Sequence, residues 1–339
     1  MAPEPTLIGD LLPELAVSMS LLREDATHTR IVAQEGPRFG VLENNLTRKG
    51  IWSTDGGRAS LAQLPHQEIL EFETDDVVGH LVVHSAMGRL TIHEMEVVSW
   101  ILAKWVERED PEDPIVEFTL AQMARDFGVV WGGSRAHFTK QAIEKLDRVR
   151  FTAEVWSHAR GELVTEHFGI FDRVTIKERK TTRTGNAHGP APIRVKLNDF
   201  LHEQLKAGQF HRYSWQILRG SLPTPLGKRL YVFLDAQRGF ETQEGMLYEH
   251  KVDAQLVSSL GIRDTNMPRV RKNLQAACVE VARAETRYLR CDLRPGPNGQ
   301  GWILSTLREP LPRANVTDRP VTPASPAAAP PLLLTGPRP

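Results

Sequence analysis

Four cationic or amide side chains lie close together near position 270 of this 339-residue chain. Arg269, Lys272 and Asn273 are spaced at i, i+3 and i+4, so they would share one face of a helix, and Arg271 flanks that face. Cations bind phosphate oxygens, and Arg, Lys and Asn hydrogen-bond to base edges in the major groove. The spacing therefore predicts a DNA-binding helix. The alternative is a solvated helix face with scattered arginines.

Further arginines surround this predicted helix. Arg263 lies in the turn before it, and Arg287, Arg290 and Arg294 follow along a predicted strand. Between residues 260 and 309 the sequence has 9 basic and 5 acidic residues. The cations concentrate at the start of the helix and along the following hairpin, where a duplex would lie.

A second and weaker set of polar side chains lies on an earlier predicted helix that begins after Ser134. Its members are Arg135, His137, Lys140, Gln141 and Arg148. Glu144 and Asp147 interrupt this face, so its positive potential is weaker. We predict DNA contact here too, with protein association as the competing interpretation.

Two similar series of helices and strands would position these residues. The first begins with a capping box at 91–94, continues with a strand at 115–120, and adds helices at 121–128 and 135–149. In the last of these helices, Phe138, Ala142, Ile143 and Leu146 are spaced for one buried face. Two strand-like runs at 151–156 and 163–170 then predict a hairpin.

The second series repeats that order. A helix at 225–238 precedes a strand, a short helix that Gly261 ends, and a long helix at 268–284 with two strands behind it. Helix, strand, helix, turn, helix and hairpin is the order of a winged helix-turn-helix, in which the third helix enters the major groove and the hairpin is the wing. The sequence thus predicts an α+β protein with two tandem winged helix-turn-helix domains.

These predictions divide the chain into four parts. Residues 1–85 form a mixed N-terminal extension that packs on the first unit, and residues 86–198 form the first winged-helix domain. Residues 199–309 form the second. The last 30 residues contain nine of the 23 prolines, which predicts a disordered, Pro/Ala-rich tail at 310–339.

The formal net charge of zero conceals a strong asymmetry. Residues 1–120 carry 21 acidic and 9 basic side chains, whereas the remainder carries 21 acidic and 33 basic ones. Such asymmetry favours nucleic-acid contact, although two domains of different isoelectric point would also produce it. Two cysteines exclude a disulfide framework or a paired-CxxC zinc site. No apolar stretch is long enough for a membrane span, and the start lacks a secretory pattern, so we expect a cytoplasmic protein.

The sequence contains no residue pattern with the spacing that a known catalytic or metal-binding motif requires. The string at 220–229 lacks the spacing of a phosphate-binding GxxxxGK[ST] loop and has Arg229 where a hydroxyl is needed. His80 and His84 would share a strand face but have no evident third ligand, and Cys278 falls on the apolar side of a helix. We therefore predict a protein without enzymatic activity, metal or cofactor.

Several segments resemble the plasmid replication initiator protein A family. The resemblance covers roughly residues 65–310 and includes the segments at 88–106, 114–129 and 134–151. It is most specific at 225–234, where the family pattern is S-P-L-A-(K/R)-R-L-Y-R-(Y/F)-L. The matching residues are Pro225, Leu226, Lys228, Arg229, Leu230, Tyr231, Phe233 and Leu234, with Gly227 in the usual Ala place.

The resemblance implies tandem winged-helix domains that bind repeated double-stranded sites at a replication origin, help to open it, and recruit the host replicative helicase and initiator. It also implies a homodimer in some states, and it supplies no catalytic residue. Lys228 and Arg229 match the motif, but only a weak phosphate-binding role follows for them. We predict that replacing Arg269 and Lys272 by alanine lowers specific affinity much more than Lys228→Ala does.

Two alternatives stay open at this point. A transcriptional regulator would use the same domains without helicase recruitment, and the DNA flanking the gene would distinguish it. An interaction scaffold would use winged helices to bind protein, and it would show no salt-dependent binding to duplex DNA.

Overall fold

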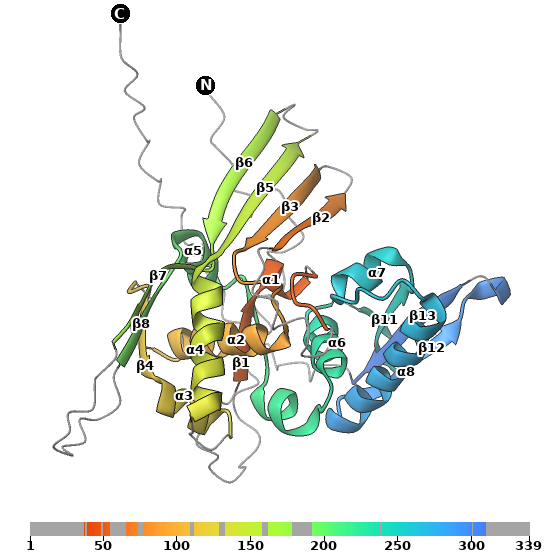
Figure 1. Cartoon of the computed structure of the whole chain (residues 1–339). Helices are drawn as coiled ribbons and strands as arrows, with labels where there is room; N and C mark the ends of the chain where they lie inside the picture. The colour runs from red at the N-terminus through yellow and green to blue at the C-terminus, as the bar shows by residue number, and fades with distance from the viewer. Residues whose placement is uncertain are drawn as a thin grey trace, which may run out of the picture.

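The computed structural model describes residues 37, 39–48, 50–54, 66–73, 77–108, 112–128, 133–157, 162–177, 192–237, 239–299 and 301–309. The predicted tail at 310–339 and the first 36 residues of the expected extension lie outside this range. The described residues combine helices with antiparallel sheets around one continuous apolar core (Figure 1). None of the described helices is both long and apolar enough to span a membrane.

The first unit follows the predicted order of elements as far as its first hairpin, and two further strands come after it. Its elements are α2 (Ile92–Val106), β4 (Ile115–Thr119), α3 (Leu120–Asp126), α4 (Gly133–Asp147), β5 (Val149–Ser157), β6 (Glu162–Gly169), β7 (Phe171–Ile176) and β8 (Pro192–Leu197). The predicted capping box is confirmed at α2, because Thr91 Oγ1 accepts from His93 N at 3.3 Å and the Glu94 carboxylate accepts from Thr91 N at 2.7 Å.

The second unit has a similar order, with one more strand after its first helix and a single hairpin after its third. Its elements are α6 (Pro225–Asp235), β10 (Phe240–Thr242), β11 (Gly245–Lys251), α7 (Ala254–Ser259), α8 (Met267–Ala284), β12 (Tyr288–Pro295), the short 3-10 turn η6 (Pro297–Gly299) and β13 (Trp302–Arg308). The Asn266 side chain caps α8 by accepting from Arg269 N at 3.3 Å. Val270, Leu274 and Cys278 are fully buried, which confirms the predicted apolar face of this helix.

Strand pairing places the hairpin that the sequence predicted as the wing of the first unit in a different sheet from β4. The β5–β6 hairpin does not pair with β4. It continues into β3 (Val77–Ser85) and β2 (His66–Glu73), and this four-stranded sheet projects from the helices (Figure 1). The strand β4 pairs with β8, and β8 pairs with β7. Alternating apolar residues predict strands but do not reveal which strand each one pairs with.

The three-stranded sheet of the first unit therefore has the order β4-β8-β7, and the second unit has β11-β13-β12 with β10 added at the edge. In both, the strand that precedes the second helix, β4 or β11, pairs with the second strand of a hairpin. The third helix contacts the first strand of that hairpin, α4 against β7 and α8 against β12. The two units are thus alike in topology, with β7–β8 in the place of β12–β13.

One predicted core position in α4 is wrong. Ala142, Ile143 and Leu146 are buried as expected, whereas the Phe138 residue is 51% exposed. Helical periodicity indicates which face of a helix is buried. The length over which that face is buried depends on the elements that pack against it.

The N-terminal strands and the connector join the two units. Their elements are β1 (Phe39–Glu43), α1 (Asn44–Arg48), α5 (Asp199–Lys206), β9 (Phe210–Ser214) and the π-helical turn η5 (Ile217–Ser221). The strand β1 pairs with β9, so the extension reaches beyond the first unit on which we expected it to pack. Although we expected the second unit to start at residue 199, α5 contacts the first unit through Phe200 on Phe168 and His202 on Trp105.

Candidate nucleic-acid interface

The helix α8 presents a polar stripe to solvent. The Arg269 side chain is 72% exposed, and Lys272 and Asn273 are exposed beside it. Asp264, in the preceding turn, lies 3.3 Å from Arg269 Nε and is the carboxylate that orients this guanidinium. The stripe points away from the core because the opposite face of the helix is buried.

The stripe continues beyond the residues that the sequence singled out. Ala276 and Arg283 are exposed on the following turns, and Val279 is 38% exposed. Ala276 lies three residues after Asn273, Val279 three after Ala276, and Arg283 four after Val279, and this helical spacing is the signal that could have found them. The exposed face of α8 therefore changes from cationic and amide side chains at its start to small apolar side chains in its later turns.

The helix α8 is fixed to the hairpin behind it. The Arg271 guanidinium lies 5.3 Å from the centre of the Trp302 ring on β13, a cation–π contact. Leu293 N, on β12, donates to Gln275 Oε1 at 3.0 Å, and Cys278 and Cys291 are both buried and free thiols. Arg271 thus braces the helix against the hairpin, while the stripe stays exposed.

Arg263 already has partners inside the chain. Its side chain is 23% exposed, donates to the Gly50 carbonyl at 3.0 Å and forms an ion pair with Glu68 on β2. The guanidinium thus holds the turn before α8 against the N-terminal strands. The DNA contact that the sequence predicted for Arg263 stays a prediction.

The three hairpin arginines differ in their surroundings. Arg287 pairs with Glu285 at 3.0 Å and with Asp235 at 3.3 Å. Burial by itself would lower the pKa of Arg287, but the hydrogen bond to Glu285 and the charge of Asp235 outweigh it and raise the pKa. Arg290 is exposed, and the half-exposed Arg294 side chain forms an ion pair with Glu249 on β11. Arg287 thus has two carboxylate partners that are themselves buried, whereas Arg294 has one partly exposed partner and Arg290 is exposed.

The face of α4 is less cationic than that of α8. His137 and Arg148 are exposed and Gln141 is half-buried, while Lys140 Nζ lies 3.6 Å from the Glu144 carboxylate. The Arg135 side chain lies outside the described residues. Burial raises the pKa of Asp147 at the end of this helix.

Another lysine of α4 points inward. The Lys145 side chain is 5% exposed, lies 3.3 Å from the Glu94 carboxylate and donates to the Arg89 carbonyl. It therefore contributes to packing, and only the earlier turns of α4 offer polar groups to a ligand.

The residues of the specific sequence signature lie between the two units. Lys228 Nζ is 2.6 Å from Glu96 Oε1, and Arg219 also pairs with this buried carboxylate on α2. Arg229 is fully buried and donates to the carbonyls of Thr47 at 2.6 Å and Ser259 at 2.7 Å. Burial lowers the pKa of Arg229 to about 9. Lys228 and Arg229 thus have structural partners.

The backbone is closely packed at the same place. We call α1 and residues 50–54 the bridging segment. A Cβ at Gly50 would lie 1.7 Å from the Ser258 carbonyl oxygen, and one at Gly261, whose φ is +67°, would lie 1.8 Å from the Trp52 carbonyl oxygen. Thr54 N donates to the Gly261 carbonyl at 3.1 Å. Only glycine permits this approach, which seats the bridging segment against the turn between α7 and α8.

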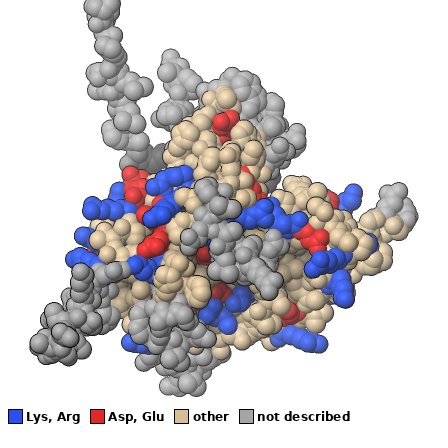
Figure 2. Space-filling view, viewed as in Figure 1, with Lys and Arg blue, Asp and Glu red and all other residues tan. Residues whose placement is uncertain are grey.

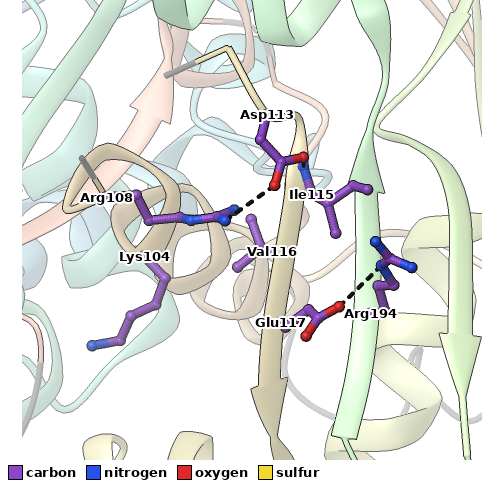
Figure 3. A pocket seen from close by; sticks show the side chains of 7 residues that line it. All are labelled: Lys104, Arg108, Asp113, Ile115, Val116, Glu117 and Arg194. Atoms are coloured by element: carbon purple, nitrogen blue, oxygen red, sulfur yellow. Dashed lines mark hydrogen bonds and ion pairs between the residues drawn. The ribbon is translucent and has the colours of Figure 1, made fainter. Parts of the chain in front are cut away.

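A hollow of about 270 Å³ lies between the end of α2 and the strands β4 and β8. Figure 3 shows its charged side chains in pairs: Arg108 is 3.1 Å from Asp113, and Arg194 is 3.0 Å from Glu117. Lys104, on the same side, is 3.3 Å from Asp126. In the described part of the chain, no group of three or more His, Cys, Asp or Glu side chains is arranged to hold a metal ion.

Comparisons with known proteins identify the fold. No protein-family model matches the chain, and no curated protein matches its sequence. The structure is similar to the crystal structure of domain 2 and domain 3 of RctB, with a TM-score of 0.55 and 12% sequence identity. The match covers 78% of this chain and 98% of that one. A second crystal structure of RctB domains 2–3 matches with a TM-score of 0.47, 10% identity, and coverage of 78% and 96%. The likeness shows a shared mixed α and β fold.

Proposed function

We propose that this chain is a non-enzymatic, sequence-specific protein that binds double-stranded DNA through two winged helix-turn-helix units. The helix α8 would read base edges in a major groove with Arg269, Lys272 and Asn273. The hairpin β12–β13 would place Arg290 and Arg294 against the backbone. The observation that carries this proposal is the exposed polar stripe of α8 on a helix that is itself fixed to the hairpin.

The first unit would occupy an adjacent groove of the same duplex. Its helix α4 offers His137, Lys140, Gln141 and Arg148, with Arg135 at its start, on a face that Glu144 makes less positive. The ion pairs of Glu96 and the buried Arg229 connect the units, so both would bind as one body. Two adjacent modules one helical turn apart require a site of about 20 base pairs.

The biological role that we propose is initiation of replication at a plasmid or secondary replicon. The resemblance to the plasmid replication initiator protein A family supports it, and the fold shared with domains 2 and 3 of RctB agrees with it. Direct repeats of the bound sequence would lie at the origin, and the host replicative helicase and initiator would be partners, with a homodimer as a further state. The proposal involves no cofactor.

Selection of duplexes from a random-sequence library, followed by titration of the selected duplex at several salt concentrations, tests the DNA-binding proposal. We expect specific binding that weakens steeply with salt, because phosphate contacts release counterions. Arg269→Ala with Lys272→Ala should lower affinity for the selected duplex far more than for an unrelated one. The matched control is Arg283→Ala at the other end of α8, which should weaken both duplexes slightly and equally. If no duplex is enriched, the DNA-binding proposal is wrong, and a protein-binding scaffold is the alternative to test.

An origin assay separates an initiator from a transcriptional regulator. The enriched sequence, cloned as direct repeats beside an AT-rich tract, should support replication of a marker plasmid when the chain is supplied. A regulator would bind the same repeats and repress a promoter beside them without maintaining the plasmid.

A further inference from the structure

The structure contains two hairpins that follow α4 in the first unit, and they differ in pairing. The β5–β6 hairpin pairs with β3 and extends the N-terminal strands. The β7–β8 hairpin pairs with β4, as β12–β13 pairs with β11. Topology therefore makes β7–β8 the counterpart of the hairpin that carries Arg290 and Arg294.

The charges of the three hairpins agree with this correspondence. The strands β7 and β8 have three cations and one acid: Arg173, Arg194, Lys196 and Asp172. The strands β12 and β13 also have three cations and one acid: Arg290, Arg294, Arg308 and Asp292. The strands β5 and β6 have the reverse balance, with Arg150 against Glu154, Glu162 and Glu166. Phosphate repels an acidic hairpin, so the charges favour β7–β8 as the hairpin that contacts DNA. Topology favours the same hairpin.

The exposed side chains of β7–β8 are suited to phosphate contact. Arg173 on β7 is exposed, Lys177 directly after β7 is exposed, and the Arg194 side chain on β8 is 58% exposed. Lys196 Nζ forms ion pairs with the carboxylates of Asp172 at 2.8 Å and Asp199 at 3.3 Å. This lysine therefore stabilises the hairpin and its connection to α5. Arg194 is likewise paired with Glu117 on β4, so Arg173 and Lys177 are the exposed cations that we assign to phosphate contact.

The positions of the hairpins in the molecule fit one duplex. Figure 1 shows β7–β8 and β12–β13 at opposite outer ends of the molecule, beyond α4 and α8 respectively. In Figure 2, Lys and Arg side chains are visible at both of these ends, with acidic side chains among them. Each hairpin thus lies on the outer side of the third helix of its own unit.

We propose that the β7–β8 hairpin is the DNA-contacting wing of the first unit, with Arg173 and Lys177 as its phosphate contacts, and that the β5–β6 hairpin stays away from the duplex. This inference rests on the proposed function. It names which of two neighbouring hairpins meets the ligand and which residues do so.

A salt titration of the full chain measures the contribution of the wing. The probe is the duplex that the wild-type chain selects from a random-sequence library. Each phosphate contact contributes about 0.9 to the slope of log affinity against log salt, so Arg173→Ala with Lys177→Ala should lower that slope by about 2. Sequence preference should remain unchanged, because phosphate contacts carry no direct base readout. An unchanged slope would overturn the inference.

Site-specific cross-linking distinguishes the two hairpins directly. Cys278 and Cys291 are buried, so a photo-reactive thiol label attaches selectively to an added surface cysteine. The Lys177→Cys variant should cross-link to the selected duplex, and the matched Thr165→Cys variant, exposed on β6, should not. The reverse result would assign the wing to β5–β6 and overturn the inference. A wild-type chain that selects no duplex would instead overturn the proposed function and this inference with it, whereas binding without a β7–β8 cross-link would overturn the inference alone.

Discussion

The two units share an element order but differ in how their third helices and hairpins are used. The second unit is compact: β12 follows α8 closely, and β12–β13 completes its sheet. In the first unit, β5 and β6 lie between α4 and the equivalent hairpin and pair with N-terminal strands instead. The second unit thus presents its helix with few additions, whereas the first carries a projecting acidic sheet. The same order of elements therefore carries an exposed cationic helix face in one unit and a face of mixed charge in the other.

The charges of the two third helices sharpen this difference. The α8 stripe has Arg269, Lys272 and Asn273 exposed, with its nearest carboxylate in the preceding turn. On α4, Lys140 lies beside Glu144 within the same face. The Glu144 carboxylate partly neutralises the charge of Lys140, the cation of α4 that would contact phosphate. We therefore expect most of the sequence discrimination to come from the second unit.

The largest expected effect is on base recognition. Arg269→Ala with Lys272→Ala should weaken specific binding by roughly 1–3 kcal/mol for each base that the helix no longer reads. The equivalent pair in the first unit, His137→Ala with Lys140→Ala, should cost less than half as much. Titration of all three proteins on the selected duplex at one salt concentration measures the difference. Equal effects from the two units would contradict the asymmetry.

The next effect is on the connection between the units. Arg229→Met removes a buried guanidinium and leaves the Thr47 and Ser259 carbonyls without its hydrogen bonds, which should lower the free energy of unfolding by about 2–4 kcal/mol. Chemical denaturation measures this value. Arg283→Ala, on an exposed site of α8, is the control and should change stability little. A loss of DNA affinity at unchanged stability would show that Arg229 acts on the ligand instead.

A smaller effect separates the arginines of the second hairpin. Arg290→Ala with Arg294→Ala should lower the slope of log affinity against log salt by about 2, since each cation would release counterions from one phosphate. Arg287→Ala should leave that slope unchanged and lower stability, because Arg287 is engaged with Glu285 and Asp235. A salt titration combined with thermal unfolding checks both statements. A change of slope in the Arg287→Ala variant would place that residue at the duplex.

The smallest expected effect concerns the exposed end of α4. Phe138→Ala should change the free energy of unfolding by less than about 1 kcal/mol, because the residue is 51% exposed. Ile143→Ala, on the buried face of the same helix, should cost about 2–5 kcal/mol. Denaturant titration compares the two. A large destabilisation by Phe138→Ala would indicate that the start of α4 is covered in solution.

Helix starts and buried helix faces were predictable because their causes are local in the chain. The capping box at Thr91 and Glu94 and the apolar spacing of Val270, Leu274 and Cys278 are visible within a few residues, and the structure confirms them. The exposed stripe of α8 follows from the same periodicity. The continuation of that stripe to Ala276 and Val279 was equally visible, but small apolar residues carry no charge to draw attention to them.

Only the tertiary structure determines which strands pair and which cations form ion pairs or hydrogen bonds within the chain. The strand β4 pairs with β8, which is more than 70 residues away, and β5 pairs with β3. The alternation of apolar and polar residues in these strands does not indicate which strand each one pairs with. Likewise Arg263, Lys228 and Arg229 resemble surface cations in sequence, yet carbonyls and carboxylates from distant segments hold them. Local hydrogen bonds and periodicity determined the elements of this protein. Competition between distant segments determined its sheets and the side chains left to meet a ligand.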